Sequence, residues 1–297
     1  MGRIKNNAVT FLGGLIMGWL MAGVMPTRGE EPANPAPKLY VFQNGLRFKT
    51  VDEGVQLIKK LGYDGVGSVY PDKLVEFKTA CDKEGLKVFS VYLGSKVSAD
   101  NFQYGKDIDE SIQLLKGTDT LLELNIQRGD HPSDAQAIAL IKEIAGKAKE
   151  AGLKLVIYPH DKFYVERIDH ALKIIKATEC DNVGIAFNLC HFLKVQPNDN
   201  LFATLTEAKP LLWSVSICGA DADGKDWNTL IRPLDEGTFD QALLLKHLHE
   251  IGHPNAIGFQ CFNIRIDPTE NLTRSIKAWK KHLAARGRNN TKTPSPQ

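Results

Sequence analysis

Short apolar runs typical of β-strands alternate with amphipathic stretches typical of helices along almost the whole of the chain. The strand-like runs lie at 39–44, 63–70, 86–94, 120–127, 153–160, 183–191, 211–221 and 256–263. Helical periodicity follows several of them, as at 133–151, 164–177 and 239–251. A glycine often stands just before the next strand, as Gly62 and Gly85 do, which suits the left-handed residue that ends a helix.

Strands that alternate with helices pair in parallel through right-handed crossovers. Eight such units in one chain of this length predict an α/β fold, a (β/α)8 TIM barrel, built as a single domain over residues 39–285. In that fold the active site lies where the strands end. The polar residues of this sequence gather at the ends of the predicted strands, so we expect the chemistry there.

The composition is that of an ordinary globular protein with a sizeable core, since 43% of the 297 residues are apolar and 24% are charged. The formal net charge is only +2, and no cluster of basic residues is interleaved with aromatic ones. We therefore expect no nucleic-acid partner.

The N-terminus departs from this soluble pattern. Arg3 and Lys5 precede an apolar run at 8–25, a combination typical of an export signal. The run is also close to the ~18 residues that a membrane helix needs. The alternative is therefore an uncleaved anchor, which would be the protein's one contact with a membrane. In both cases the folded part would lie outside the cytoplasm. We expect a signal peptide, a Pro-rich spacer and a disordered tail at 1–29, 30–38 and 286–297.

The five cysteines form no CxxC motif and no compact disulfide framework. They stand at positions 81, 180, 190, 218 and 261. A core of this size needs no disulfides, so we expect packing roles. A bridge between Cys190 and Cys218 stays open, because geometry rather than sequence decides it.

Polar residues share one face of the predicted strand 120–127. Side chains alternate along a strand, so Glu123, Asn125 and Gln127 fall on the face opposite the apolar set and should point into the barrel, Gln127 nearest its mouth. A buried, unpaired glutamate is costly, so Glu123 is expected to have a partner or a raised pKa. A structural ion pair at the barrel floor and a catalytic role are both open for Glu123.

The next two predicted strands end in histidines. Tyr158 and His160 close one strand, and Asn188 and His191 close its neighbour. An unperturbed imidazole titrates near neutral pH, so either histidine could act as an acid or a base. Two histidines on adjacent strand ends favour a site over two separate structural roles.

The last two strands add further polar candidates. Ser216 and Gln260 are candidates for inward positions, and Asp221 is the best placed of the charges in the loops that follow. Amides, hydroxyls, a phenol and imidazoles make a hydrogen-bonding surface suited to a polyol. The sequence contains no P-loop, GxGxxG, HExxH or GxSxG motif. A small-molecule carbohydrate is therefore the expected partner.

Three segments carry a resemblance to a known family. The sequences at 62–66, 184–191 and 233–240 are GYDGV, GIAFNLCH and PLDEGTFD. They resemble the GxDGVE, DxGH and PLGxGxxD motifs of the xylose isomerase-like TIM-barrel superfamily, the sugar phosphate isomerases and epimerases. The resemblance covers nearly all of residues 39–283. With its Tyr-Pro-His and Asn-Leu-Cys-His strand ends, the chain looks similar to an exported subset in planctomycete-type bacteria.

The resemblance implies one divalent metal, held by Glu, Asp, His and Glu on strands five to eight. All four ligands are replaced in this sequence, where the corresponding residues are Tyr158, Asn188, Ser216 and Gln260. Amides and hydroxyls lack the charge that offsets dehydration of a divalent cation. We expect no metal ligands and no cofactor in this set. Mn²⁺, Zn²⁺ or Mg²⁺ is implied by the family alone; an alternative site would combine both histidines with Glu123 or Asp221.

The resemblance implies an exported isomerase or epimerase that moves a proton beside a carbonyl of a sugar. We expect His160 to be the base, His191 its partner and Tyr158 the acid, with Glu123 as a fourth catalytic candidate. The expected substrate-binding residues are Asn125, Gln127, Asn188, Ser216, Asp221 and Gln260. The alternatives are a metal-free lyase or hydrolase acting on an oxidised glycoside and a non-catalytic sugar-binding barrel.

Overall fold

The computed structural model describes residues 36–253 and 256–286. The predicted signal peptide, most of the spacer and the tail after residue 286 lie outside these ranges. Within them, none of the helices combines the length and the apolar character that a bilayer crossing requires.

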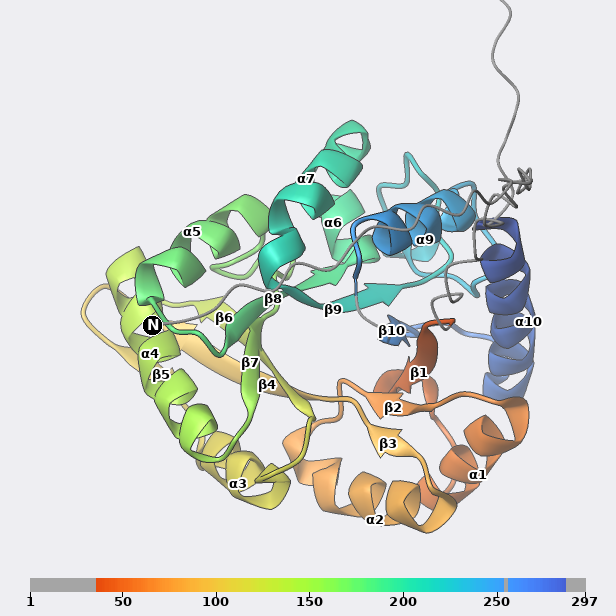
Figure 1. Cartoon of the computed structure of the whole chain (residues 1–297), viewed down its shortest axis with the longest axis horizontal. Coiled ribbons are helices and arrows are strands. Elements are labelled where there is room, and N and C mark those ends of the chain that lie inside the picture. Colours follow the sequence, from red (N-terminus) through yellow and green to blue (C-terminus); the bar gives the residue numbers. More distant parts are fainter. Residues whose placement is uncertain (1–35, 254–255, 287–297) are drawn as a thin grey trace, which may run out of the picture. The chain divides into compact units, whose positions relative to one another are not determined.

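In the described residues, ten strands form one sheet in the order β3-β2-β1-β10-β9-β8-β7-β6-β4-β5 (Figure 1). The strands are β1 Lys38–Phe42, β2 Gly65–Gly67, β3 Lys87–Val88, β4 Ser90–Val97, β5 Phe102–Tyr104, β6 Leu121–Arg128, β7 Lys154–Ile157, β8 Val183–Asn188, β9 Leu212–Ile217 and β10 Ala256–Phe259. All neighbours pair in parallel except β4 and β5. The sheet therefore has the parallel pairing that the strand–helix alternation predicts.

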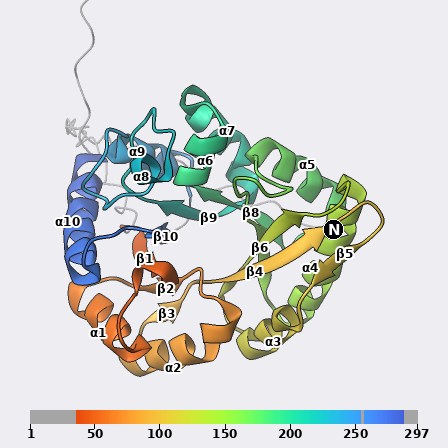
Figure 2. The same ribbon diagram turned by 180° about the vertical axis from the view of Figure 1, so that it is seen from behind.

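Ten α-helices lie on the outside of this sheet in the described ranges (Figure 1). They are α1 Val51–Leu61, α2 Leu74–Glu84, α3 Lys106–Leu115, α4 Asp134–Glu150, α5 Ile168–Thr178, α6 Leu189–Val195, α7 Leu201–Ala208, α8 Trp227–Leu230, α9 Gln241–Glu250 and α10 Pro268–Arg286. The short helix α8 lies beside α6, as the view from behind shows (Figure 2).

The sheet closes into a barrel with eight strand positions. The strands β3 and β4 are parts of one strand interrupted at Phe89, since β3 pairs with β2 and β4 pairs with β6. A parallel bridge from Val69 to Val91 joins the two halves of the ring, and β1 pairs with β10. Leaving out the hairpin strand β5, the ring confirms the predicted (β/α)8 barrel.

Local signals in the sequence set the helix ends. Thr50 and Ser133 cap α1 and α4, where their hydroxyls accept hydrogen bonds from the backbone N–H groups of Glu53 and Gln136. Gly62 ends α1 with φ 87°, a left-handed conformation that costs a residue with a Cβ. The predicted glycine stops are therefore confirmed.

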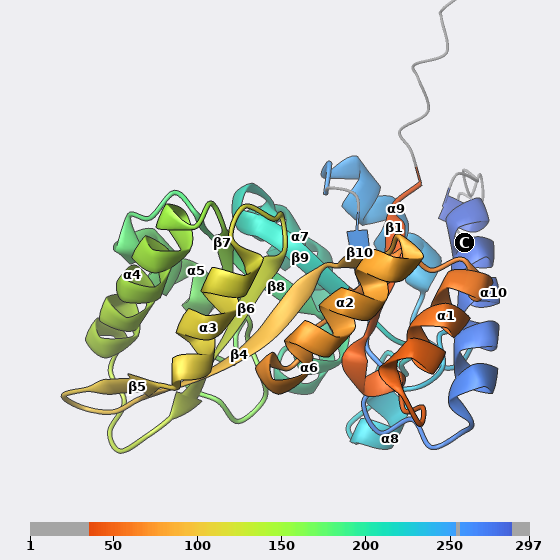
Figure 3. The same cartoon turned by 90° about the horizontal axis from the view of Figure 1, so that it is seen from below.

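Several predicted boundaries are wrong. The run 183–191 is a strand only to Asn188, after which α6 begins, so His191 lies in a helix. The predicted helix 164–177 starts at Ile168. Residues 95–104, which follow the predicted strand 86–94, contain the end of β4 and the strand β5, which form an antiparallel hairpin at the same edge of the barrel as α8 in Figure 3.

All five cysteines are free thiols, and four of them are buried. The open possibility of a bridge between Cys190 and Cys218 is not realised in this structure. Burial raises the pKa of the Cys190 thiol well above its usual range and that of Cys261 likewise. Neither group is therefore a thiolate near neutral pH, and the packing interpretation is confirmed for both.

Candidate active site at the barrel mouth

A cavity of about 340 Å³ lies where several barrel strands end. Tyr158 and His160 reach it from the loop after β7, His191 from the first turn of α6, and Gln260 from the loop after β10. These four are the only predicted site residues in its wall within the described ranges. They come from three different strand ends, so the barrel itself brings them together.

The two histidines form a close pair. Their ring centroids are 4.0 Å apart, and His191 is only 7% exposed. His160 stacks on Phe163 with ring centroids 4.0 Å apart. Trp227 contacts the edge of His191 at a centroid distance of 5.4 Å. Packing on both sides therefore fixes the orientation of each imidazole ring.

The backbone groups of one residue, Asp161, determine which nitrogen of each ring carries a proton. Its carbonyl oxygen lies 2.8 Å from Nδ1 of His160, and only a protonated Nδ1 can donate to it. The N–H of Asp161 donates to Nδ1 of His191 at 3.4 Å, so that Nδ1 must be unprotonated. In neutral rings, Nε2 of His160 is then a free base, and Nε2 of His191 is an N–H donor.

Burial keeps both rings neutral. Desolvation lowers the pKa of His160, and it lowers the pKa of His191 well below the usual range. Repulsion from His160 lowers the pKa of His191 further. At neutral pH the pair therefore offers one proton acceptor and one proton donor, which is what acid–base chemistry on a carbon acid requires.

Tyr158 supplies a second donor to the cavity. Its hydroxyl oxygen accepts a hydrogen bond from Nδ2 of Asn188, which leaves the phenolic proton for a ligand. Burial raises the pKa of Tyr158 well above its usual range, so the phenol keeps its proton. Asn188 does not line the cavity; it orients Tyr158, and its Oδ1 accepts from the Cys190 N–H as the cap of α6.

Gln260 supplies a third donor. Its Oε1 accepts hydrogen bonds from the Phe262 N–H at 2.9 Å and from Nδ2 of Asn44 at 2.8 Å. A backbone N–H can only donate, so the amide orientation is fixed and Nε2 is the group that remains for the cavity. Gln260 therefore presents a hydrogen-bond donor to the cavity, and its substrate-binding role stays a prediction.

Glu123 lies in the barrel interior and does not line the cavity. Ser214 Oγ donates to Glu123 Oε1 at 3.3 Å, while Oε2 is buried without a partner. Burial raises the pKa of Glu123 to about 7. The described residues provide no ion pair for Glu123, so of the two expected outcomes the raised pKa is found. Its catalytic role stays a prediction.

Four more predicted substrate-binding residues are placed away from the cavity wall. Asn125 is buried and donates from Nδ2 to the Leu93 carbonyl. Ser216 is buried beside the Phe187 carbonyl. Asp221 pairs with Arg232, with both carboxylate oxygens 3.1–3.2 Å from the guanidinium. Gln127 is exposed beyond the mouth, at the end of β6.

The family model described as xylose isomerase-like TIM barrel matches residues 55–282. The chain belongs to the xylose isomerase-like TIM barrel family. A search among curated proteins found no match. The predicted family and fold are thereby confirmed, and the site can be compared with what the family resemblance implies.

Solved structures with the same fold include two sugar epimerases and a zinc-binding protein. The 3-keto-D-glucoside 4-epimerase YcjR from E. coli is 17% identical with a TM-score of 0.65, covering 83% of this chain and 100% of that one. A D-allulose 3-epimerase from Methylomonas sp. is 14% identical, with a TM-score of 0.60 and coverages of 84% and 99%. The IOLI protein with a bound zinc atom is 17% identical, with a TM-score of 0.63 and coverages of 84% and 98%.

The residues at the implied metal positions do not fit a divalent cation. Tyr158, Asn188, Ser216 and Gln260 carry no charge near neutral pH, and hydrogen bonds inside the protein engage the amide oxygens of both Asn188 and Gln260. The alternative set also fails, because Glu123 and Asp221 lie outside the cavity that the histidines line. In the described part of the chain, no group of three or more His, Cys, Asp and Glu side chains could hold a metal.

Sequence reasoning missed much of the cavity wall. The overlooked residues include Asn44, Ser68, Tyr70, Tyr92, Trp227 and Phe262. Tyr70 closes the predicted strand 63–70, so the strand-end rule that selected His160 would also have selected it. Trp227 lies in the long insertion after β9, where no pattern in the sequence distinguishes one residue as a site residue.

Proposed function

We propose that this protein is a carbohydrate isomerase or epimerase that moves a proton beside a carbonyl group without a metal. The observation that carries the proposal is the histidine pair, held neutral and in opposite tautomers at one cavity. A site that only bound a sugar would have no need of a desolvated base beside a donor. The sugar epimerase titles among proteins of the same fold also support a sugar substrate.

The reaction follows from the placement of the groups. Nε2 of His160 takes a proton from the carbon next to the substrate carbonyl. The electrons of the broken C–H bond form a C=C bond, and negative charge moves to the carbonyl oxygen. For an epimer, a solvent proton adds to the other face of the same carbon, the C=O bond re-forms, and His160 releases its proton to solvent. For an isomer, the former carbonyl oxygen gains a proton, the hydroxyl on the deprotonated carbon loses one and becomes the new carbonyl, and His160 returns its proton to the former carbonyl carbon. The product has the same composition as the substrate, so no other reactant is consumed.

Three neutral donors would stabilise the charge that develops on the oxygen. They are the Tyr158 hydroxyl, Nε2 of Gln260 and Nε2 of His191, all in the wall of the same cavity. Donors that are already oriented stabilise an oxyanion without reorganising, and loss of one typically costs about 10²–10³ in kcat. Such a site replaces the charge of a metal with fixed dipoles.

The test is solvent exchange at carbon. Keto-sugars and 3-keto-glucosides would be incubated with the protein in D₂O, and loss of the C–H signal beside the carbonyl would be followed by NMR. We expect exchange with at least one of them, and we expect His160→Gln to slow it by about 10²–10⁴-fold, the usual contribution of a general base. His247→Gln, on the outer helix α9, is the matched control and should exchange at the normal rate.

Product analysis then separates the alternatives. An isomer or epimer supports the proposal, whereas release of a substituent from the next carbon identifies the lyase alternative. Binding of a sugar without any solvent exchange would support the alternative of a non-catalytic sugar-binding barrel. Full exchange by folded His160→Gln protein would refute the assignment of the base.

A further inference from the structure

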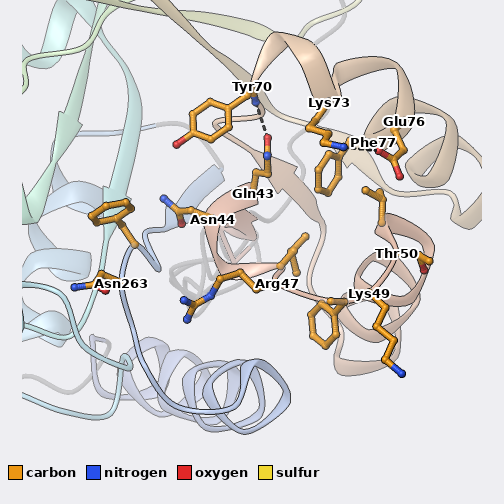
Figure 4. A pocket seen from close by; sticks show the side chains of 14 residues that line it. Gln43, Asn44, Arg47, Lys49, Thr50, Tyr70, Lys73, Glu76, Phe77 and Asn263 are labelled. Atoms are coloured by element: carbon orange, nitrogen blue, oxygen red, sulfur yellow. Dashed lines mark hydrogen bonds and ion pairs between the residues drawn. The ribbon is translucent and has the colours of Figure 1, made fainter.

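A second cavity, of about 480 Å³, adjoins the one at the barrel mouth. The two share Asn44, Tyr70 and Phe262 in their walls, so they lie next to each other across these residues. Figure 4 shows Asn44, Arg47 and Tyr70 around the same open space. The reaction proposed above uses only the first cavity, which leaves the larger second one without a role.

The boundary between the cavities is marked by exposed aromatic rings. Only five large apolar side chains are exposed in the described residues, and two of them, Tyr70 at 40% and Phe262 at 54%, stand at this boundary. The other three are aliphatic and line neither cavity. Exposed aromatic rings cost free energy in the unliganded protein and offer flat apolar surfaces to a ligand.

The backbone that carries these rings is held in an unusual conformation. Ser68, two residues before Tyr70, has φ 49°, and Asn263, directly after Phe262, has φ 58°. Neither residue is glycine, so each conformation is strained. The Ser68 N–H donates to Ser90 Oγ at 2.8 Å, and the Tyr70 N–H donates to Gln43 Oε1 at 2.6 Å. These bonds fix the loop that presents Tyr70.

The wall of the second cavity contains both polar and aromatic side chains. Gln43, Asn44, Arg47 and Lys73 stand among the rings of Phe48 and Phe77 in its wall. Arg47 is anchored by donating from Nη2 to the Ile264 carbonyl. An apolar ligand would bury these polar groups without partners, at a cost. A sugar ring, with an apolar face and hydroxyls around its edge, matches both kinds of side chain.

We propose that the second cavity binds a second sugar unit, so that the substrate is a glycoside of two units rather than a free monosaccharide. The carbohydrate class rests on the function proposed above. The mouth cavity is near the lower end of the ~300–1,000 Å³ range of small-molecule sites, which suits one sugar ring. The ring beside His160 would be the reacting unit, and the glycosidic bond would pass between Tyr70 and Phe262.

Binding affinity tests this inference independently of catalysis. The full-length protein would be titrated calorimetrically with cellobiose, maltose and trehalose, and with methyl α- and β-glucoside as single-unit probes. We expect at least one disaccharide to bind at least tenfold more tightly than the methyl glucosides. Arg47→Ala should reduce that preference at least fivefold while changing methyl glucoside affinity less than twofold.

Arg167→Ala is the matched control, because Arg167 is a partly exposed arginine that lines neither cavity. It should keep the full preference. The inference is overturned if every disaccharide binds no better than the methyl glucosides, or if the preference survives in Arg47→Ala. A disaccharide preference without any solvent exchange would retain the second subsite and reject the proposed reaction.

Discussion

His160 and His191 differ in tautomer because of the backbone of a single residue, Asp161, and not because of their own side chains. The N–H and C=O of Asp161 select opposite tautomers, and burial keeps both rings uncharged. His160 loses its role if its ring is protonated, since Nε2 would no longer accept a proton. Activity should therefore fall on the acid side of the lowered pKa of His160.

Glu123 makes the stability of the barrel depend on pH. Its pKa is about 7 in the fold against 4.5 for the free side chain, so the folded state holds a proton that the unfolded state has lost between these values. Stability from this group therefore decreases as pH rises from 4.5 to 7, by about 3 kcal/mol in all. Glu123→Gln should flatten this decrease and be more stable than the parent protein at pH 8.

Denaturant titrations at pH 5 and pH 8 measure the effect. Glu150→Gln, at an exposed position at the end of α4, serves as the control and should leave the pH dependence unchanged. The raised pKa of Glu123 would be wrong if Glu123→Gln lost as much stability between the two pH values as the parent protein does.

The sequence predicted the face of each strand residue better than its depth. Alternation along β6 correctly separates Glu123, Asn125 and Gln127 from the apolar set, but these three lie at different heights in the barrel. Glu123 is buried in the interior, whereas Gln127 is exposed beyond the mouth. Depth depends on strand register and on neighbouring loops, which a period of two residues does not encode.

At the scale of elements, the start of α6 couples a helix cap to the site. Asn188 caps the helix through Oδ1 and directs the Tyr158 hydroxyl through Nδ2. Asn188→Asp keeps an acceptor for the cap and removes the donor, so the phenolic proton would turn toward the carboxylate. We expect at least tenfold slower solvent exchange with little loss of stability.

Asn188→Ala removes both interactions and should also destabilise the protein by about 1 kcal/mol, a typical cost for a lost cap. Asp240→Ala removes the equivalent cap of α9, where Asp240 accepts from the Leu243 N–H, without touching the site. It should match the stability loss and keep full exchange. Equal exchange rates in Asn188→Asp and the parent would contradict the positioning role of Asn188.

The element that sequence reasoning misplaced is this same helix. Every residue from Val183 to Leu193 is buried, so the strand β8 and the first turns of α6 form one uninterrupted buried run. The spacing of apolar residues cannot show where such a run changes from strand to helix. His191 was nevertheless selected, because the start of a helix that follows a barrel strand lies at the same end as the strand terminus.

At the scale of the whole molecule, eight βα units bring residues from across the chain to one rim. This architecture follows from the strand–helix alternation in the sequence. The cavity wall was predicted only in part, because loops such as those of Tyr70 and Trp227 take their positions from tertiary packing. The second cavity, which contacts the loops after β1 and β10, carries no signal in the sequence at all.

At the scale of the whole molecule we also make a prediction about metal binding. The protein incubated with Mn²⁺, Zn²⁺ and Mg²⁺ and then desalted should retain no stoichiometric metal, because the four positions at the strand ends offer no charged ligand. Elemental analysis measures this directly. Retention near one ion per chain would show that other groups complete a site and would restore metal-assisted chemistry.

The most direct test of the account is the protonation state of the two histidines, read by ¹⁵N NMR of the imidazole nitrogens at pH 7. His160→Gln and His191→Gln samples would assign the signals. We predict a protonated Nδ1 and an unprotonated Nε2 in His160, and the reverse in His191. Two identical tautomers, or an imidazolium at either position, would contradict the acid–base pair on which the proposed reaction depends.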